Sequence, residues 1–229
     1  MEILPEHLRQ VVAFRNASEE ELGEILVAST VRGVEEGEYF FLQGDPAERA
    51  YVLLQGQVKL LQSNPQGQSV NLRTVSAWQL FGALGVVRDV PEYPASAQAM
   101  VDCSALAVPS EFLKAMFRST PRLSMDLMQL MTSYIQEMQS RYVELATQRV
   151  EQRICRTLLR LVSQSGRKVS DAVELTFSRE DLAEMSGTTV YTVSRTLADW
   201  SRRGLVETGR ERVRILQPHA LVRLAEGLP

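Results

Sequence analysis

The residues best placed to do chemistry lie in one segment, SREDLAEMSGTTVYTVSRTLADWSRRGLV, which runs from Ser178 to Val206. Hydroxyl and guanidinium groups recur along it. Hydroxyls bond phosphate oxygens, and a guanidinium can also bond the O6 and N7 atoms of a guanine as a pair. Arg195 is the best-placed guanidinium, and Tyr191 lies one helical turn before it. This chemistry is typical of the recognition of double-stranded DNA.

The remainder of the sequence offers little for catalysis or metal binding. No nucleophile–base pair, metal cluster or phosphate-binding loop is recognisable. The two histidines are His7 and His219, and the two cysteines, Cys103 and Cys155, lie far apart without a CxxC spacing. Such cysteines fit small buried side chains better than a disulfide or a metal pair. We therefore expect no enzymatic activity, no metal and no cofactor.

Two short helices and a hairpin must position the DNA-binding side chains. Ser178 and Asp181 form a capping box for a first helix that ends near Ser186. Gly187 follows as the turn residue, because glycine adopts a positive φ at little cost. Thr188 is the expected N-cap of a second helix.

The second helix is expected to run through Trp200, with Ala183 small where the two helices nearly touch and Val193 apolar where the second turns inward. Residues 205–216 alternate as a hairpin, which makes a wing. This pattern predicts a winged helix-turn-helix, whose second helix enters the major groove.

Charge is divided unevenly along the chain. Residues 1–147 carry 11 Lys and Arg against 18 Asp and Glu, while residues 148–229 carry 14 against 10. Thirteen of those 14 bases are arginine. A basic C-terminal part agrees with DNA binding there. No apolar run approaches membrane-spanning length, and the N-terminus lacks a basic start followed by an apolar run, so we expect a cytoplasmic protein with no membrane partner.

The N-terminal part has a different sequence pattern. Residues 4–30 predict short helices, with Ser18 and Glu21 as a capping box. From residue 31 to 109, short apolar runs are separated by turn signals at Gly44-Asp45, Gly56 and residues 64–67, which predicts an antiparallel β-roll or jelly roll.

A long helix is predicted after Pro121, without Gly or Pro through about Leu145. Apolar residues recur along it at coiled-coil spacing, with Arg141 at the skipped position. The spacing favours a dimer seam. The alternative is a core helix packed on its own domain. The expected seam consists of Leu127, Met131, Tyr134, Met138 and Leu145.

The sequence resembles the Crp/Fnr family of bacterial transcription regulators. LAEMSGTTVYTVSRTLADWSRRGLV resembles the family's DNA-binding signature, GEYFFLQGDPAERAYVLLQGQVKLLQ its cyclic-nucleotide-binding-type β-roll, and YPASAQAM the end of its effector pocket. The resemblance implies an α+β chain with a β-roll sensory domain at 1–120, a dimerisation helix at 121–147 and a winged helix-turn-helix domain at 148–229. It also implies a homodimer that binds a palindromic operator and works with RNA polymerase, as an activator in many members.

The resemblance also assigns the DNA-contacting residues. Those expected to read bases are Tyr191, Ser194 and Arg195. Family members commonly carry Glu where this chain has Tyr191, so a carboxylate contact with cytosine is lost. The residues expected to contact the DNA backbone are Arg179, Thr188, Thr189, Thr192, Arg202, Arg203 and Arg212.

The effector pocket departs from the cyclic-AMP-binding members. In those members a Glu after Phe-Gly holds the ribose and an Arg-Ser pair holds the cyclic phosphate, whereas this chain has Ala83, and Pro94-Ala95 or Ala95-Ser96. No base follows Arg88 before the pocket ends. The expected pocket residues are Phe81, Gly82, Ala83, Leu84, Ser96, Met138 and Gln139. We therefore expect no gating by cyclic AMP; the alternative is a regulator gated by a cyclic nucleotide or another small ligand through a non-standard pocket.

Other effectors stay open. The N-terminus has no cysteine cluster for an iron–sulfur centre, and His7 alone gives little support for haem. An apolar or acidic small molecule, a redox signal through Cys103 or Cys155, and no effector at all remain as alternatives.

Overall fold

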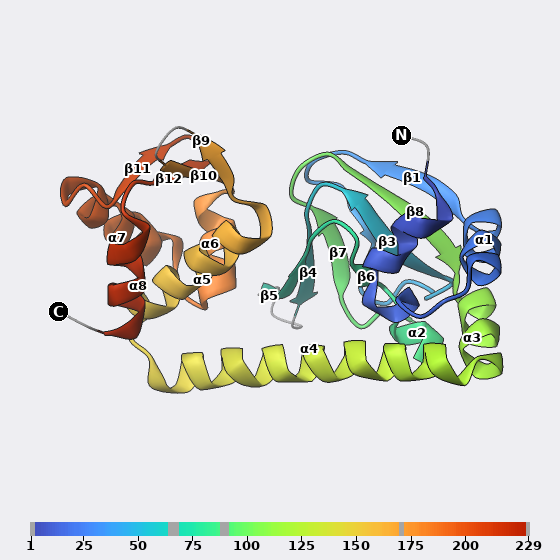
Figure 1. The fold of residues 1–229 in the computed structure, drawn as a ribbon. Coiled ribbons are helices and arrows are strands. Elements are labelled where there is room, and N and C mark those ends of the chain that lie inside the picture. Colours follow the sequence, from blue (N-terminus) through green and yellow to red (C-terminus); the bar gives the residue numbers. More distant parts are fainter. Residues whose placement is uncertain (1–2, 64–68, 88–91, 170–171, 228–229) are drawn as a thin grey trace. The chain divides into compact units, whose positions relative to one another are not determined.

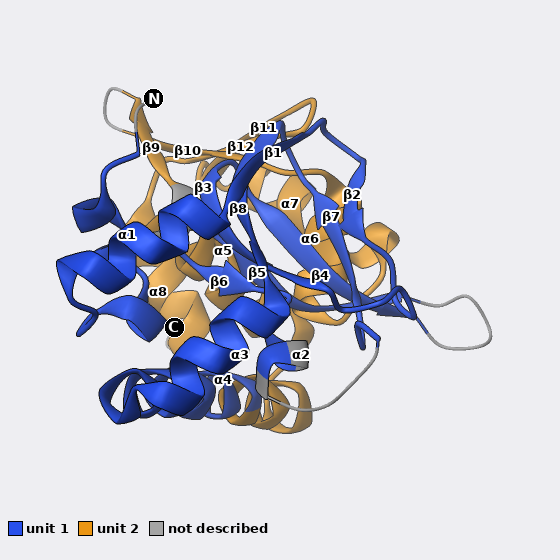
Figure 2. Cartoon of the chain, turned by 90° about the vertical axis from the view of Figure 1, so that its right-hand side faces the viewer, with its two compact units in different colours: residues 1–138 blue, residues 139–229 orange. Residues whose placement is uncertain are grey.

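The computed structural model describes residues 3–63, 69–87, 92–169 and 172–227. Figure 2 shows its two compact units, residues 1–138 (unit 1) and residues 139–229 (unit 2). The division falls inside one helix, α4 (Pro121–Thr147), and not at either end of it.

Two antiparallel sheets form the centre of unit 1 (Figure 1). The order of the first is β1-β8-β3-β6, and that of the second is β2-β7-β4-β5. Their bounds are β1 Thr30–Val34, β2 Tyr39–Phe41, β3 Arg49–Gln55, β4 Val58–Ser63, β5 Ser69–Val75, β6 Leu80–Phe81, β7 Ser96–Ala99 and β8 Cys103–Pro109. The predicted antiparallel β-roll is confirmed. The predicted turn at residues 64–67 lies outside the described residues.

Strand β3 shows why this sheet holds together. Its run AYVLL, from Ala50 to Leu54, is buried on both faces, because successive side chains of a strand point in opposite directions. Tyr51 and Leu53 join the aromatic core between the two sheets, where Phe40 and Phe81 lie edge to face. Val52 belongs instead to a second core under the helices.

The helices of unit 1 cover the outer face of the first sheet. They are η1 Pro5–Gln10, η2 Val12–Phe14, α1 Glu19–Ala28, α2 Leu84–Val87, α3 Ser110–Ser119 and the first part of α4. Phe14, Leu113 and Leu123 are fully buried in the core they share with the sheet. The predicted capping box opens α1, where the Ser18 backbone N–H donates to Glu21 Oε2 at 2.7 Å and Glu21 N donates to Ser18 Oγ at 3.2 Å.

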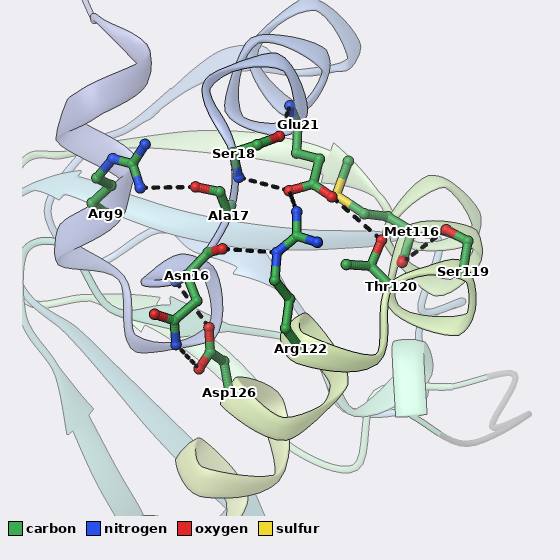
Figure 3. A network of polar contacts seen from close by, with 10 residues as sticks. All are labelled: Arg9, Asn16, Ala17, Ser18, Glu21, Met116, Ser119, Thr120, Arg122 and Asp126. Carbon is green, nitrogen blue, oxygen red and sulfur yellow. Dashed lines mark hydrogen bonds and ion pairs between the residues drawn. The ribbon is translucent and has the colours of Figure 1, made fainter.

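A polar network ties the start of α4 to the N-terminal segment (Figure 3). The backbone N and the side-chain Nδ2 of Asn16 donate to the two carboxylate oxygens of buried Asp126, at 3.0 and 2.7 Å. Arg122 donates to the Asn16 carbonyl at 3.0 Å and to the Glu21 carboxylate. The Ser18 N–H, with help from Arg122, lowers the pKa of Glu21, so that carboxylate stays ionised. These contacts fix the N-terminal end of α4 against unit 1.

Unit 2 combines helices with a small sheet of order β11-β12-β10-β9. Its elements after α4 are α5 Val150–Ser165, β9 Arg167–Val169, β10 Ala172–Thr176, α6 Arg179–Ser186, α7 Val190–Arg202, β11 Val206–Gly209, β12 Arg212–Ile215 and α8 Pro218–Glu226. The helix pair α6–α7 and the hairpin β11–β12 confirm the predicted winged helix-turn-helix. Within the described ranges, no helix is long and apolar enough to cross a membrane.

Candidate nucleic-acid interface and ligand pocket

The turn between α6 and α7 has the expected local chemistry. Ser178 and Asp181 cap α6, with Asp181 N donating to Ser178 Oγ at 3.0 Å. Gly187 ends it in the left-handed region at φ 62°. The N-cap of α7 is Thr189, one residue later than predicted, because Thr188 N still bonds the Ala183 carbonyl of α6 at 3.0 Å. Thr189 Oγ1 accepts from Thr192 N at 3.2 Å.

Apolar contacts hold α7 in one orientation. Val193, Leu197 and Trp200 are completely buried on its inner face, and Ala183 of α6 is 3% exposed where the helices approach each other. The Trp200 indole N–H donates to Glu151 Oε1 at 2.9 Å, which satisfies its polar atom. The opposite face of α7 is therefore fixed toward solvent.

A single arginine, Arg153 of α5, holds the carbonyls of the turn. Its Nε donates to the Ser186 carbonyl and its Nη2 to the Gly187 carbonyl, both at 3.0 Å. Its Nη1 donates to the Gln148 carbonyl, just after α4, at 3.1 Å. The left-handed φ of Gly187 favours glycine there, and a Cβ would also lie 2.6 Å from the end of the Leu145 side chain. The sequence analysis missed this support, since a contact between residues 153 and 187 leaves no local pattern.

The outer face of α7 carries the predicted base-reading residues. Tyr191 is 75% exposed, and Arg195 lies exposed one turn further along the helix. Among the described residues, no acidic side chain forms an ion pair with Arg195. Ser194 is half-buried, and exposed Ala198 continues the line of Tyr191 and Arg195. Val190, 40% exposed at the start of the helix, is a further candidate that the sequence analysis did not name.

Several of the predicted backbone-contacting arginines already have partners within unit 2. Arg202 bonds Asp199 at 2.9 Å, and Arg203 lies 3.5 Å from the same carboxylate. Arg179 is half-buried. Arg210, at the tip of the wing, is exposed and forms no ion pair within the described part of the chain. The sequence analysis left Arg210 out because it lies between the two wing strands and not in their alternating pattern.

Ion pairs join the two wing strands to each other and to β10. Arg214 Nε donates to Glu174 Oε2 at 2.8 Å across β12 and β10, and it lies 3.5 Å from Glu207 on β11. Arg212, a predicted phosphate contact, lies 3.8 Å from Glu174. The hydrogen bond from Arg214 lowers the pKa of Glu174, so this carboxylate is ionised at neutral pH. These ion pairs orient Arg212 and Arg214.

Unit 1 contains a cavity of about 210 Å³ between its sheets and the first part of α4. Its walls are mainly apolar. The lining residues are Phe41, Leu60, Leu72, Arg73, Leu80, Phe81, Gly82, Ala83, Leu84, Tyr93, Pro94, Ala95, Leu130, Met131, Tyr134, Glu137 and Met138. Gly82 has φ 67°, and a Cβ there would lie 3.0 Å from the Phe41 ring, so its backbone approaches the aromatic core as closely as only glycine can.

The predicted pocket residues are only partly brought together. Phe81, Gly82, Ala83, Leu84 and Met138 line the cavity. Ser96 does not, because its hydroxyl accepts from Gln43 N at 2.8 Å outside the cavity. Gln139 is exposed on α4 and also does not line it. Arg88 lies outside the described residues.

Arg73 on β5 is the cation that the sequence analysis missed in this pocket. Its guanidinium lies 3.8 Å from the centre of the Tyr134 ring, and its Nε lies 3.8 Å from Glu137 Oε2. Its Nη2 donates to Gln79 Oε1 at 2.8 Å. Arg73 lies on β5, away from the segment that corresponds to the family's Arg-Ser pair, so that segment gives no sign of it.

Two residues of the predicted dimer seam, Leu127 and Tyr134, pack within unit 1 itself. Leu127 is buried in unit 1's own core, and Tyr134 packs against it with its hydroxyl donating to the Leu80 carbonyl at 3.0 Å. These two residues belong to the face of α4 that covers unit 1. Met138 and Leu145 are exposed, at 61% and 53%, and Met131 is partly buried.

The cysteines and His7 are poorly placed for redox or haem chemistry. Burial raises the pKa of Cys103 and raises that of Cys155 to about 12, so neither thiol ionises at neutral pH. His7 Nδ1 accepts from Leu4 N at 3.2 Å. No group of three or more His, Cys, Asp and Glu suited to a metal occurs in the described residues.

Two family models match the chain. One describes a cyclic nucleotide-binding domain and matches residues 31–120; the other describes a Crp-like helix-turn-helix domain and matches residues 152–224. Together they cover both the β-roll and the α6–α7 pair.

Relatives match over most of their length. A CRP-like cAMP-activated global transcriptional regulator of Mycobacterium tuberculosis is 25% identical, over 82% of this chain and 85% of its own. A global nitrogen regulator of Synechococcus elongatus is 29% identical, over 88% of this chain and 92% of its own. The crystal structure of a CRP/FNR-family transcriptional regulator of Thermus thermophilus superimposes with a TM-score of 0.73 at 26% identity, covering 86% of this chain and 98% of that one.

Proposed function

Because the chain belongs to the Crp/Fnr family of transcription regulators and carries a DNA-binding helix-turn-helix, we propose that it acts as a homodimer on a palindromic operator. Each protomer places α7 in a major groove, and the two grooves lie one helical turn of DNA apart, about 34 Å. The observation that carries this proposal is the exposed line of Tyr191, Arg195 and Ala198 on α7, a helix whose opposite face is buried in unit 2.

Base reading falls to the exposed side chains at the start of α7. Arg195 is free to fork onto a guanine edge, because no carboxylate competes for it among the described residues. The Tyr191 ring and the Val190 methyl groups suit apolar contact with a thymine methyl. Ser194 is half-buried beside Arg195 and supports a hydroxyl contact to a base or phosphate.

Backbone contacts set the register of the complex. Thr188, Thr189 and Thr192 lie at the N-terminus of α7, where unpaired N–H groups also attract phosphate. Arg210 adds a charge at the wing that has no ion-pair partner among the described residues. Arg179, Arg202, Arg203 and Arg212 remain candidates; phosphates would have to compete with Asp199 for Arg202 and Arg203, and with Glu174 for Arg212.

Dimerisation is supported by an exposed apolar face on α4 that repeats every seven residues. One column consists of Met128, Ile135 and Tyr142, which are 61%, 57% and 74% exposed. The other consists of Met131, Met138 and Leu145. These six residues, the heptad face, follow 3-4-3-4-3 steps, which is the spacing of a two-stranded coiled coil. The heptad face keeps Met131, Met138 and Leu145 of the expected seam and leaves out Leu127 and Tyr134.

Cyclic AMP is not the effector in this proposal, although the mycobacterial relative is cAMP-activated by name. Ala83 offers no carboxylate for ribose, and the one cation on the cavity wall, within the described residues, is bonded to Glu137 and Gln79. Calorimetry with millimolar cyclic AMP should give no saturable heat, and DNA affinity should stay within twofold. Micromolar binding would instead favour the cyclic-nucleotide-gated alternative.

In vitro selection of DNA bound by the ligand-free protein tests the main proposal. We expect an inverted repeat whose half-sites lie about 10–11 base pairs apart, centre to centre, with a guanine at one symmetric position. Sedimentation of the same sample should give a dimer. Enrichment of a single, non-repeated site, or of no site, would contradict the proposal.

A further inference from the structure

The cavity in unit 1 offers no unengaged polar side chain among its described lining residues. Tyr93 donates its hydroxyl to the Arg49 carbonyl at 2.6 Å, and Tyr134 donates its own to the Leu80 carbonyl. Burial raises the pKa of Tyr134, so its phenol stays neutral. Arg73 and Glu137 face each other at 3.8 Å. Every other lining residue is apolar or glycine.

A ligand with a negative charge is therefore poorly matched to this wall. Arg73 already contacts the Glu137 carboxylate, the Gln79 amide oxygen and the Tyr134 ring, so an anion would have to share its guanidinium with them. Glu137 would then repel the anion at the same place, because like charges at close range disfavour each other. Moving an uncharged, apolar molecule into the cavity breaks none of these contacts and removes apolar surface from water.

The volume limits the size of the molecule. An apolar protein cavity of roughly 150 Å³ is large enough to bind benzene. At about 210 Å³, this cavity has room for two fused rings or an aliphatic group of the same volume.

We propose that the cavity binds an uncharged, mainly apolar molecule of about this size. The binding itself does not depend on the proposed function. Only the role of the molecule as the regulator's effector rests on that function. Two lining residues, Met131 and Met138, also belong to the heptad face, so the ligand touches side chains on which dimerisation depends.

Matched probes test the charge preference on the full chain without DNA. Indole is a neutral two-ring molecule, and indole-3-acetate carries the same ring with a carboxylate. Isothermal titration calorimetry should give saturable binding of one indole per chain and at least tenfold weaker binding of indole-3-acetate. Tighter binding of indole-3-acetate than of indole would overturn the proposal, and so would the absence of saturable indole binding.

Cavity-filling variants test the location. Ala83→Leu and Leu60→Trp extend into the cavity from the residue before α2 and from β4, whereas Val27→Trp adds a ring at a position that is 90% exposed on α1. We expect both filling variants to weaken indole binding at least tenfold, and Val27→Trp to leave it unchanged. Circular dichroism selects the folded variants; Leu60 is only half-buried, so Leu60→Trp keeps the test available if Ala83→Leu does not fold.

DNA binding is measured separately on the same samples. Indole binding without operator binding would refute the proposed regulator and leave the cavity proposal standing. Operator binding without indole binding would refute the cavity proposal alone. Indole binding that survives in folded Leu60→Trp would place the probe elsewhere and overturn the site.

Discussion

Arg73 in unit 1 and Arg195 in unit 2 are the same residue type in opposite environments, one engaged by neighbouring side chains and the other exposed to solvent. Arg73 lies against the Tyr134 ring, opposite Glu137 and bonded to Gln79. Arg195 projects from α7 into solvent, with no ion-pair partner among the residues that the structure describes. The first charge is neutralised inside the fold, and the second is available to a phosphate or a base. Pairing decides which arginine can meet an external anion, and residue type alone does not.

Disrupting the heptad face should have the largest effect, because the proposed dimer uses two copies of Arg195 on one operator. Met128→Lys with Ile135→Lys places like charges opposite each other across a two-fold interface. We expect a monomer by sedimentation and an operator affinity that falls roughly 10³-fold or more, to the non-specific level. Gln129→Lys with Gln136→Lys has the same spacing on exposed positions outside the heptad face and should remain dimeric. A dimer that persists in the first variant would show that α4 does not carry the interface.

Removing Arg195 tests the exposed member of the pair directly. Arg195→Ala should cost about 1–3 kcal/mol of discrimination per half-site and relax the preference at one symmetric base pair in a selection experiment. The matched variant Arg202→Ala removes an arginine that is paired with Asp199, so it should weaken binding only slightly and leave the motif unchanged. If Arg195→Ala returned the wild-type motif, Arg195 would contact only the DNA backbone.

Arg153 is the engaged arginine of unit 2, and its substitution should act through stability. Lysine cannot donate to three carbonyls in a planar arrangement, so Arg153→Lys leaves carbonyls at Ser186, Gly187 or Gln148 without a partner. We expect unfolding to be easier by about 1–3 kcal/mol, seen as a lower midpoint of thermal unfolding. An unchanged midpoint would mean that water replaces the guanidinium at the turn.

The smallest expected effect is a change in how DNA affinity depends on salt, which should differ between an exposed arginine and an engaged one. Arg210→Ala removes a wing charge that has no ion-pair partner in the described part of the chain, and it should lower the slope of log affinity against log salt by about one per subunit. Arg73→Met removes an engaged charge from the cavity and should leave the slope unchanged. An equal change in both slopes would break the distinction between the two units.

The sequence was sufficient where the determining contacts are local. The capping box at Ser178, the positive φ of Gly187 and the alternating wing follow from neighbouring residues, and each is present in the structure. It was insufficient where a residue's partner comes from a distant element. Arg73 and Glu137, or Arg153 and Gly187, meet only through the fold, and no spacing along the chain signals them.

The seam shows a second limit. Helix α4 carries two apolar stripes at similar spacing, one against unit 1 and one exposed. Periodicity identifies an amphipathic helix, but it does not say which stripe the chain's own core will cover. Only the burial of Leu127 and Tyr134 distinguishes them.

Half of the heptad face is methionine, at positions 128, 131 and 138, and Ile135 is the one β-branched residue among the six. Methionine is unbranched and has three rotatable bonds, so it fills a contact by adapting its shape. Branched side chains would fix one crossing angle between paired helices, whereas thioethers repack at low cost. Two helices joined through such a surface can exchange between neighbouring arrangements without separating. The interface is then compliant, and small changes in the contacts beneath Met131 and Met138 are enough to select one arrangement over another.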